Sequence, residues 1–381
     1  MLAFLITGFV SSALTYASAR AIKKKNAVFL SIIAVTCICI FAGIRDDSVG
    51  TDTLLYGVPG FESAKIESWD VWYSNYAGWH PLGFCLLTWV TAHVIPSRIF
   101  YFSMLQLLVI LPIYYSIWRN NKNDAWIGIF VYSIFLLPVS LNLMKQMIAV
   151  AFCILSFDYA QNERFIPFIV CVCTGSLFHF SALFFLPVYL LMLSWNRRDK
   201  IAATIAEHRL CFLVLIAFLL LTTVTVVINF KEILRLAWQI KPSLGVAYLG
   251  FGDGELYESA LALLAGTILC GCYLMRHSEW RDSVDGVVVR SYPMVLLILI
   301  TGLLMMQLDV VADTLSRLSL FGLGLCPLFA TQSYALAKHS SREHRLACLF
   351  TLFFMMLVVA YSVYTFGITG AQQVCPYSTI L

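Results

Sequence analysis

The feature that most constrains this chain is a series of apolar runs, most of roughly 17 residues or more, separated by short polar segments. A hydrocarbon environment requires each backbone polar group to be satisfied internally, so such runs favour membrane-spanning helices. The chain is 60% hydrophobic and only 12% charged, whereas about 25% is charged in soluble domains. These features predict an all-α, polytopic integral membrane protein with residues 1–381 as one transmembrane domain. The runs are approximately 2–19, 27–44, 99–118, 125–141, 144–160, 165–193, 210–229, 259–275, 292–308, 314–336 and 346–366.

Two regions do not fit a single ordinary span. Residues 165–193 are too long for one crossing and short for two, and "SLFHFS" lies near their middle. We interpret them as a pair of short helices, or a re-entrant hairpin, that turns around residues 175–179. Residues 81–96 are short and bounded by prolines, so they cross, re-enter or lie in the interface. The total prediction is about twelve crossings.

The basic residues predict the orientation, because short cytoplasmic loops are enriched in Lys and Arg. Placing loops 20–26, 119–124, 161–164, 196–209, 276–290 and 337–345 in the cytoplasm collects about 17 of the 25 Lys and Arg there. The outer side then holds the N-terminus, the tail 367–381 and two sizeable loops, about 45–80 and 230–258. This arrangement requires 81–96 not to cross and 165–193 to cross twice or re-enter.

Metal and nucleic-acid chemistry find little support in the sequence. The twelve cysteines lie mostly in apolar runs, and their Cys-x-Cys pairs point to different helix faces, which favours packing roles. No histidine has a partner at metal-ligand spacing, and we expect neither a metal nor a cofactor. The net charge of +4 is too small and dispersed to indicate nucleic acid as a partner.

A dense polar cluster follows the second apolar run, in the stretch "GIRDDSVGTDTLLY" at 43–56. Arg45 comes directly after the run, followed by Asp46, Asp47, Asp52 and Tyr56. In an ordinary interfacial loop, Arg45 would pair with the adjacent aspartates. In a functional site, the glycines would let the loop fold back on the helix end.

A second cluster lies in "SLNLMKQMIAV", where Asn142, Lys145 and Gln146 are spaced i, i+3 and i+4. This spacing predicts one helical face beside a membrane boundary. The ordinary alternative for Lys145 is a lysine whose ammonium reaches water from a helix start. The two amides on the same face favour a binding site.

Three further polar positions lie near the outer side. His179 stands alone in an apolar stretch, where histidine is usually a hydrogen-bonded packing residue. Asp309, Asp313 and Arg317 follow one another at i, i+4 and i+8, so Asp313 and Arg317 either neutralise each other or leave Arg317 to meet a ligand. The remaining members of the outer polar set are His80 and Tyr377.

The outer side thus combines cations, carboxylates and aromatic residues. Ionisable groups near hydrocarbon are costly and are functional candidates by default. Arginine suits phosphate or pyrophosphate, and aromatic faces with carboxylates suit sugars. A lipid-linked pyrophosphate sugar satisfies both demands, because its tail stays in the bilayer while its headgroup reaches the rim. The aromatic residues are Trp69, Trp72, Tyr73, Tyr76 and Trp79.

These motifs resemble the EpsG-type polysaccharide polymerases, which belong with the Wzy-type O-antigen polymerases. "AGIRDDSVGTDTLLY" is similar to their Arg…Val-Gly-Thr-Asp-Thr…Tyr signature, and "NLMKQMIAVAF" to their Arg-Gln-x-x-Ala segment. "LFHFSALFFLPVYLL", "LSRLSLFGLGLCPL" and "VCPYSTIL" resemble the later segments in order, from about residue 40 to the end. The chain departs at Lys145, where the family usually has Arg, and so loses the bidentate fork.

The resemblance implies polymerisation of a glycan at the periplasmic face of a bacterial inner membrane. A growing chain on undecaprenyl pyrophosphate would be transferred to a new lipid-linked repeat unit, so donor and acceptor are both lipid-linked oligosaccharides held beside membrane lipid. Arg45 and Arg317 are then predicted pyrophosphate ligands, and Asp52 and His179 compete for the role of general base. A polysaccharide chain-length regulator is a plausible partner. The predicted substrate-binding residues are Lys145, Gln146, Asn142, Tyr56, His80, Asp313 and Tyr377.

Three other functions remain open at this point. A flippase or transporter of the same lipid-linked oligosaccharide would place its cations in a central cavity and carry repeated broken spans, which the sequence does not display. An O-antigen ligase shares the leaving group but typically carries a larger periplasmic loop. A purely structural membrane partner would not need so many outer-face charges.

Overall fold

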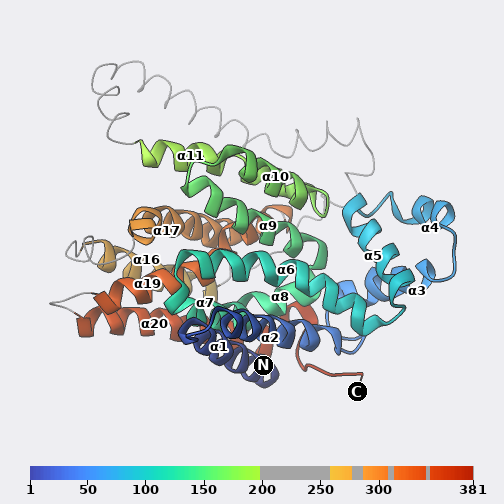
Figure 1. Ribbon diagram of the computed structural model, residues 1–381, viewed down its shortest axis with the longest axis horizontal. Coiled ribbons are helices and arrows are strands. Elements are labelled where there is room, and N and C mark those ends of the chain that lie inside the picture. The colour runs from blue at the N-terminus through green and yellow to red at the C-terminus, as the bar shows by residue number, and fades with distance from the viewer. Residues whose placement is uncertain (198–257, 277–285, 308–312, 340–343, 381) are drawn as a thin grey trace, which may run out of the picture.

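A computed structural model describes residues 1–197, 258–276, 286–307, 313–339 and 344–380. Within these ranges the chain is helical and contains no strand, which confirms the predicted all-α class (Figure 1). Most long helices run in roughly the same direction, so the described part is a bundle with two ends. The predicted loop 230–258 and the run 210–229 lie almost entirely outside the described residues.

The first half of the chain supplies most of the bundle. α1 packs against α2 and α7, α2 against α6, and α6 against α9, which also contacts α10 and α11. The elements are α1 (Leu2–Arg20), α2 (Lys24–Gly43), η1 (Thr53–Gly57), α3 (Val58–Ala64), α4 (Trp69–Tyr76), α5 (Leu82–Val94), α6 (Arg98–Asn120), η2 (Lys122–Asp124), α7 (Ala125–Val131), η3 (Tyr132–Leu136), α8 (Leu137–Asn142), α9 (Met144–Gln161), α10 (Phe165–Ser176), η4 (Phe180–Phe185) and α11 (Pro187–Asn196).

The second half adds a group of helices on the α7 and α9 sides of the bundle. α17 packs against α18, and α20 against α16 and α19. Gly302 and Gly322 let α17 and α18 approach closely, because an added Cβ at either position would lie within 3 Å of the other backbone. These elements are α16 (Glu258–Arg276), α17 (Gly286–Met306), α18 (Asp313–Leu323), α19 (Cys326–His339), α20 (His344–Ser362), η7 (Val363–Ile368) and η8 (Ala371–Gln373).

Seven segments of the described chain are long and apolar enough to cross a membrane, against about twelve predicted crossings. They are Leu2–Arg20, Lys24–Gly43, Arg98–Asn120, Lys122–Asn142, Glu258–Arg276, Arg317–Lys338 and Arg345–Ile368. Four shorter apolar helices lie at Leu82–Val94, Phe165–Ser176, Phe180–Asn196 and Ser291–Met306. The chain is therefore a multi-pass membrane protein, and the higher count stays a prediction.

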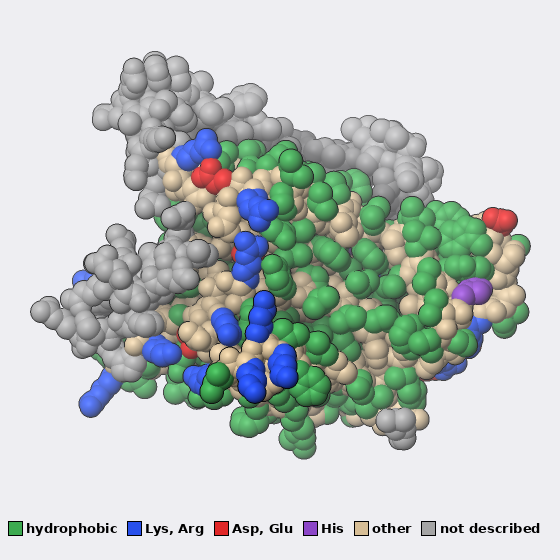
Figure 2. Space-filling model, viewed as in Figure 1, with side chains coloured by type: hydrophobic (Ala, Val, Ile, Leu, Met, Phe, Trp, Pro, Cys, Tyr) green, Lys and Arg blue, Asp and Glu red, His purple; other side chains and the backbone are tan. Residues whose placement is uncertain are grey.

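The described basic loops gather at one end of the bundle, which we call the basic end. Arg119 pairs with Asp158 at 2.9 Å, and Lys338 lies 3.7 Å from Asp124. Figure 2 shows a band of Lys and Arg across this part of the molecule, away from α3, α4 and α5. Segments that the positive-inside argument assigns to one side thus meet in the structure.

The positions of their ends show how the two regions that do not fit a single span, 81–96 and 165–193, are arranged. α5 begins beside the 176–179 turn, where Gly83 N–H donates to the Leu177 carbonyl at 2.8 Å, and it ends near Arg98, which pairs with Asp47. Both ends of α5 therefore lie at the end opposite the basic end (Figure 1). The predicted requirement that 81–96 does not cross agrees with this geometry.

Residues 165–196 form the predicted pair of short helices. α10 runs away from the basic end, the chain turns at 177–179, and η4 with α11 returns. The two ends of this hairpin meet, because Asn196 Nδ2 donates to the Gln161 carbonyl at 3.2 Å and Arg197 pairs with Glu163 at 2.8 Å. The hairpin therefore begins and ends at the basic end.

Candidate functional site

The loop after α2 turns inward at Gly50. Its φ of +84° is a left-handed conformation that favours glycine, and a Cβ there would lie 2.9 Å from the Leu141 carbonyl oxygen. The Thr53 hydroxyl donates to the Val49 carbonyl at 2.8 Å and closes the turn. The predicted fold-back of this loop is confirmed, and it brings Asp52 to the end of α8.

Asn142 holds the loop in place from the other side. Its Oδ1 accepts from the Thr51 hydroxyl at 2.8 Å and from the Asp52 N–H at 3.0 Å, and its Nδ2 donates to Gln372 Oε1 at 2.5 Å. The preceding helix contains a π-helical turn, Tyr132–Leu136, followed by Pro138. Proline lacks the N–H that a regular helix needs, which accounts for the irregular turn.

The expected single helical face for Asn142, Lys145 and Gln146 is wrong. The helix ends at Asn142, Leu143 adopts φ −82° and ψ 56°, and α9 begins at Met144. The break rotates Asn142 toward the 50–52 loop, while Lys145 and Gln146 face other partners. Helical spacing predicted the proximity of the three residues but not their directions.

Arg45 is buried, with 3% of its surface exposed. Its guanidinium lies 4.1 Å from the centre of the Phe102 ring, Nη2 lies 3.0 Å from Met144 Sδ, and Nε has no hydrogen-bond partner. Burial lowers the pKa of Arg45 to about 10, so the group stays charged at neutral pH. A thioether is a weak acceptor, and the guanidinium retains donor capacity.

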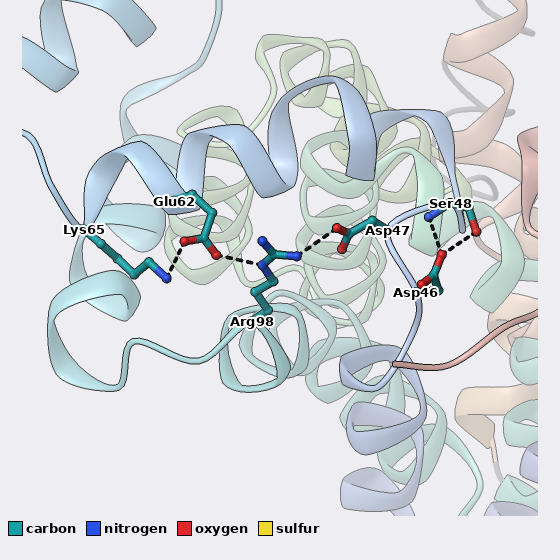
Figure 3. Close-up of polar contacts among 6 residues, drawn as sticks. All are labelled: Asp46, Asp47, Ser48, Glu62, Lys65 and Arg98. Atoms are coloured by element: carbon teal, nitrogen blue, oxygen red, sulfur yellow. Dashed lines mark hydrogen bonds and ion pairs between the residues drawn. The ribbon is translucent and has the colours of Figure 1, made fainter. Parts of the chain in front are cut away.

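The adjacent aspartates do not neutralise Arg45. Asp46 Oδ1 accepts from the Ser48 N–H and hydroxyl, and Asp47 pairs with Arg98 at 2.8 Å (Figure 3). Arg98 also binds Glu62 at 2.7 Å, so it ties the 45–48 loop to α3. The ordinary reading of Arg45 as a loop residue paired with its neighbours is therefore wrong.

The C-terminal tail packs against Arg45. Arg45 and Thr379 form an antiparallel bridge, in which Asp46 N–H donates to the Ser378 carbonyl and Ile380 N–H to the Ile44 carbonyl, both at 3.0 Å. The Tyr377 ring stacks on Phe41 at 4.2 Å, and its hydroxyl donates to the Phe41 carbonyl. Tyr377 thus lies at the predicted end of the molecule and fastens the tail to α2.

Lys145 points to the 45–80 region. Its Nζ lies 2.9 Å from His80 Nδ1 and 4.2 Å from the centre of the Tyr56 ring. Burial and the neighbouring Lys145 charge lower the pKa of His80 to about 3, so the imidazole is neutral and its Nδ1 accepts a hydrogen bond from the ammonium. His80 and Tyr56 also contact each other, with ring centres 4.8 Å apart.

Asp52 is the half-buried carboxylate at the centre of this arrangement. It accepts a hydrogen bond from the Tyr56 hydroxyl. Burial raises its pKa, while that hydrogen bond and the charges of Lys145, Arg317 and Arg45 lower it, and the net effect is an increase. Three cations from the 45–52 loop, α9 and α18 therefore act on one carboxyl group.

Arg317 lines a cavity of about 230 Å³ beside Asn142 and Gln372. Gln146 Nε2 donates to the Arg317 backbone carbonyl at 2.7 Å and so connects α9 to α18. The other cavity walls come from α8, α17, α20 and η7 and are largely apolar, with Ser319 and Thr365 as polar exceptions. The side chain of Asp313 lies outside the described part, as does Asp309.

His179 lies in the turn of the hairpin. Its Nδ1 is 2.5 Å from the Ser181 hydroxyl and 3.4 Å from the Ser181 N–H, so the side chain caps the following 3-10 helix. Burial and the charges of Lys145 and Arg317 lower its pKa to about 4. His179 is therefore neutral and within electrostatic reach of the same cations.

Sequence reasoning missed Gln372, Met144 and Phe102, which contact Asn142 and Arg45. Met144 and Phe102 lie within apolar runs and carry no signal of their own. Gln372 has a φ of +66° and lies two residues after Gly370, and that glycine is a turn signal in the tail sequence. No group of three metal-ligand side chains occurs among the described residues.

The fold and this set of residues define a multi-pass helical membrane protein with a polar, cation-rich site at the end opposite the basic end. The EpsG family profile matches residues 28–379, nearly the whole chain, and the chain belongs to the EpsG family. No curated protein and no solved structure matches it.

Proposed function

We propose that the protein polymerises a polysaccharide from lipid-linked repeat units, as an O-antigen polymerase at the periplasmic face of the bacterial inner membrane. The family suggests a polysaccharide polymerase. The observation that supports the finer proposal is that the charges of Arg45, Lys145 and Arg317 all lower the pKa of Asp52. Asp52 is hydrogen-bonded to Asn142, which lines a cavity together with Arg317. Cations around a carboxylate suit a reaction in which a hydroxyl group is deprotonated while pyrophosphate departs.

In the proposed reaction, a hydroxyl oxygen of the acceptor repeat unit bonds to the anomeric carbon of the donor glycan. The bond between that carbon and the pyrophosphate oxygen breaks, and its electron pair stays on the undecaprenyl pyrophosphate. The acceptor proton passes to a carboxylate or imidazole. Arg317 in the cavity and Arg45 behind Met144 would stabilise the departing charge, with a phosphate oxygen replacing the weakly accepting thioether.

Asp52 is the better supported base. It is half-buried, its pKa is raised above the usual range, and Asn142 fixes its backbone. His179 Nδ1 is hydrogen-bonded to the Ser181 hydroxyl, so only Nε2 can contact a substrate. The two candidates are distinguished by Asp52→Asn and His179→Gln, because loss of the base should abolish transfer while loss of a cap should lower protein stability.

Lys145 is proposed to support the site as a point charge. Its contact with neutral His80 leaves the ammonium without a direct carboxylate partner among the described residues. His80, Tyr56 and Gln146 then act mainly by holding Lys145, Asp52 and α18 in place.

The proposal is tested in a deletion strain that expresses single variants. Arg317→Ala and Arg45→Ala should collapse the polymer ladder of lipopolysaccharide to single-repeat products while membrane protein levels persist. Removing one donor to a developing charge typically costs about 10²–10³ in rate. Arg197→Ala is the matched control, because Arg197 pairs with Glu163 at the basic end, away from the candidate site. Normal chain lengths in both site variants would refute the proposal.

The lipopolysaccharide products of the deletion strain distinguish a polymerase from a ligase and a flippase. Single-repeat capping indicates a polymerase, complete absence of O-antigen a ligase, and precursor retained at the cytoplasmic face a flippase. Purified protein with one defined undecaprenyl-pyrophosphate-linked repeat unit should form dimers and longer products. A chain-length regulator, if it docks, should narrow that distribution without being required for the first transfer.

A further inference from the structure

A second cavity, which we call the α2–α6 groove, lies far from the candidate site. It has a volume of about 820 Å³ and begins at the α1–α2 connection. α2 is about 30 Å long, so its Lys24 end and the Arg45 end are separated by nearly the full hydrocarbon thickness. The groove is lined by Ala21, Ile22, Lys24, Ala27, Val28, Ser31, Ile32, Val35, Thr36, Leu107, Leu111, Tyr114, Tyr115, Trp118 and Lys122.

The groove has lysines at its entrance and mainly apolar side chains along the rest of its walls. From Lys24 to Thr36 it covers about 18 Å along α2, which is close to one leaflet of a bilayer core of roughly 30 Å. Lys24 and Lys122 lie at the entrance, and the described residues that line the groove include no Asp or Glu. Neither lysine forms an ion pair with a carboxylate among the described residues.

Two hydroxyl groups in the wall, those of Ser31 and Tyr114, are already hydrogen-bonded within the protein. The Tyr114 hydroxyl donates to Ser31 Oγ at 2.9 Å, and Ser31 Oγ lies 2.9 Å from Ser18 Oγ, which donates to the Ala27 carbonyl at 2.6 Å. With these two hydroxyls occupied, the wall presents a mainly apolar surface to an occupant. Trp118 stacks on Tyr114 near the entrance, and Lys122 Nζ lies 5.5 Å from the Trp118 ring centre.

We propose that the α2–α6 groove binds an anionic diacyl phospholipid from the leaflet at the basic end. One acyl chain lies between α2 and α6, and the phosphate group is held by Lys24 and Lys122. Two ammonium groups that form no ion pair among the described residues select a negatively charged headgroup over a zwitterionic one. Trp118 and Tyr114 are suited to the headgroup boundary, where one side of an aromatic ring is apolar and the other polar.

The test uses delipidated full-length protein in detergent and two probes with brominated acyl chains, phosphatidylglycerol and phosphatidylcholine. Bromine quenches tryptophan fluorescence at contact, and the difference between wild type and Trp118→Phe isolates the groove signal. Phosphatidylglycerol should quench Trp118 at a lower concentration than phosphatidylcholine. Equal quenching by the two lipids would overturn the proposal.

Charge-matched double variants assign the headgroup contact. Lys24→Ala with Lys122→Ala should weaken phosphatidylglycerol quenching roughly tenfold or more. Lys23→Ala with Lys25→Ala removes the same charge from exposed neighbours that do not line the groove, and it should change quenching little. Equal effects of the two pairs would show only general surface attraction and would contradict the site.

A third variant fills the groove without removing charge. Val28 is 49% exposed and lines the groove, so Val28→Phe should occupy lipid space without disturbing the core. It should reduce quenching by phosphatidylglycerol at unchanged thermal stability. Unchanged quenching would overturn the assignment to a diacyl phospholipid. The same holds if, in a competition experiment, only an added polyprenyl phosphate and no diacyl phospholipid displaces the brominated probe.

Discussion

Asp52 is partly buried and lies close to three cations. Its pKa is set by the balance between burial, which raises it, and the cations, which lower it. Burial raises its pKa, and the Tyr56 hydrogen bond is the first of several effects that lower it. A raised pKa also means that folding favours the protonated form, so this carboxyl contributes more to stability as the pH falls through that range. Activity has the opposite sign, because a general base must be ionised.

Tyr56→Phe tests this balance. Removing the hydroxyl removes a contact that lowers the pKa of Asp52, so that pKa should rise further. The acidic limb of the rate–pH profile for polymerisation should therefore move to higher pH. Purified enzyme and a defined lipid-linked substrate give the measurement. An unmoved acidic limb, with Asp52→Asn still active, would remove Asp52 as the base.

Asn142→Ala tests the support of the loop. The Thr51 hydroxyl and the Asp52 N–H would lose a shared acceptor in a buried place, which costs about 1–3 kcal/mol in the free energy of unfolding. Thermal unfolding in detergent and the polymer ladder should both decline. Asn123→Ala, an exposed asparagine at the basic end, should change stability by less than about 0.5 kcal/mol.

At the scale of elements, the site depends on two changes in chain direction, of which the sequence pattern predicted the first and not the second. Gly50 turns the loop after α2, and Leu143 separates α8 from α9. Each break points a polar side chain at a partner more than 80 residues away, as in the pairs Asn142–Asp52 and Gln146–Arg317.

Gly50→Ala and Gly78→Ala form a matched pair at this scale. At Gly50 a methyl group meets the Leu141 carbonyl oxygen at 2.9 Å in a left-handed backbone, which should cost about 1–2 kcal/mol or more of stability and lower activity. At Gly78 nothing lies within 4 Å of the added carbon. Chemical or thermal unfolding midpoints measure the difference, and equal midpoints would count against the turn.

At the scale of the whole molecule, the grouping of loops at the two ends of the bundle indicates how the protein is oriented in the membrane. The basic loops gather at one end, and the 45–80 region, the 177–179 turn and the C-terminal tail gather at the other. The positive-inside rule favours the cytoplasm for the basic end, which is the orientation that the proposed periplasmic site requires.

Added cysteines at two exposed positions test this assignment in intact cells. Asp70→Cys on α4 should react with a membrane-impermeant maleimide added outside, once the outer membrane is permeabilised. Asn123→Cys at the basic end should react only after the inner membrane is opened. The native chain gives the background from its own cysteines. The reverse labelling pattern would invert the orientation and with it the proposed periplasmic site.

The sequence by itself determined the helical membrane class, the grouping of Arg45, Lys145 and Arg317 near one end of the bundle, and the hairpin at 165–193, because apolar length, charge placement and ordered motifs are local properties of the chain. Only the tertiary structure decided that Arg45 is buried away from Asp46 and Asp47, that Asn142 turns from the face of Lys145, and that the tail covers Arg45. Those outcomes depend on contacts between residues about 90 to 330 positions apart, such as Asn142 with Asp52 and Arg45 with Thr379. A pattern along the chain does not show which distant residue will supply the hydrogen-bond partner of a given polar group.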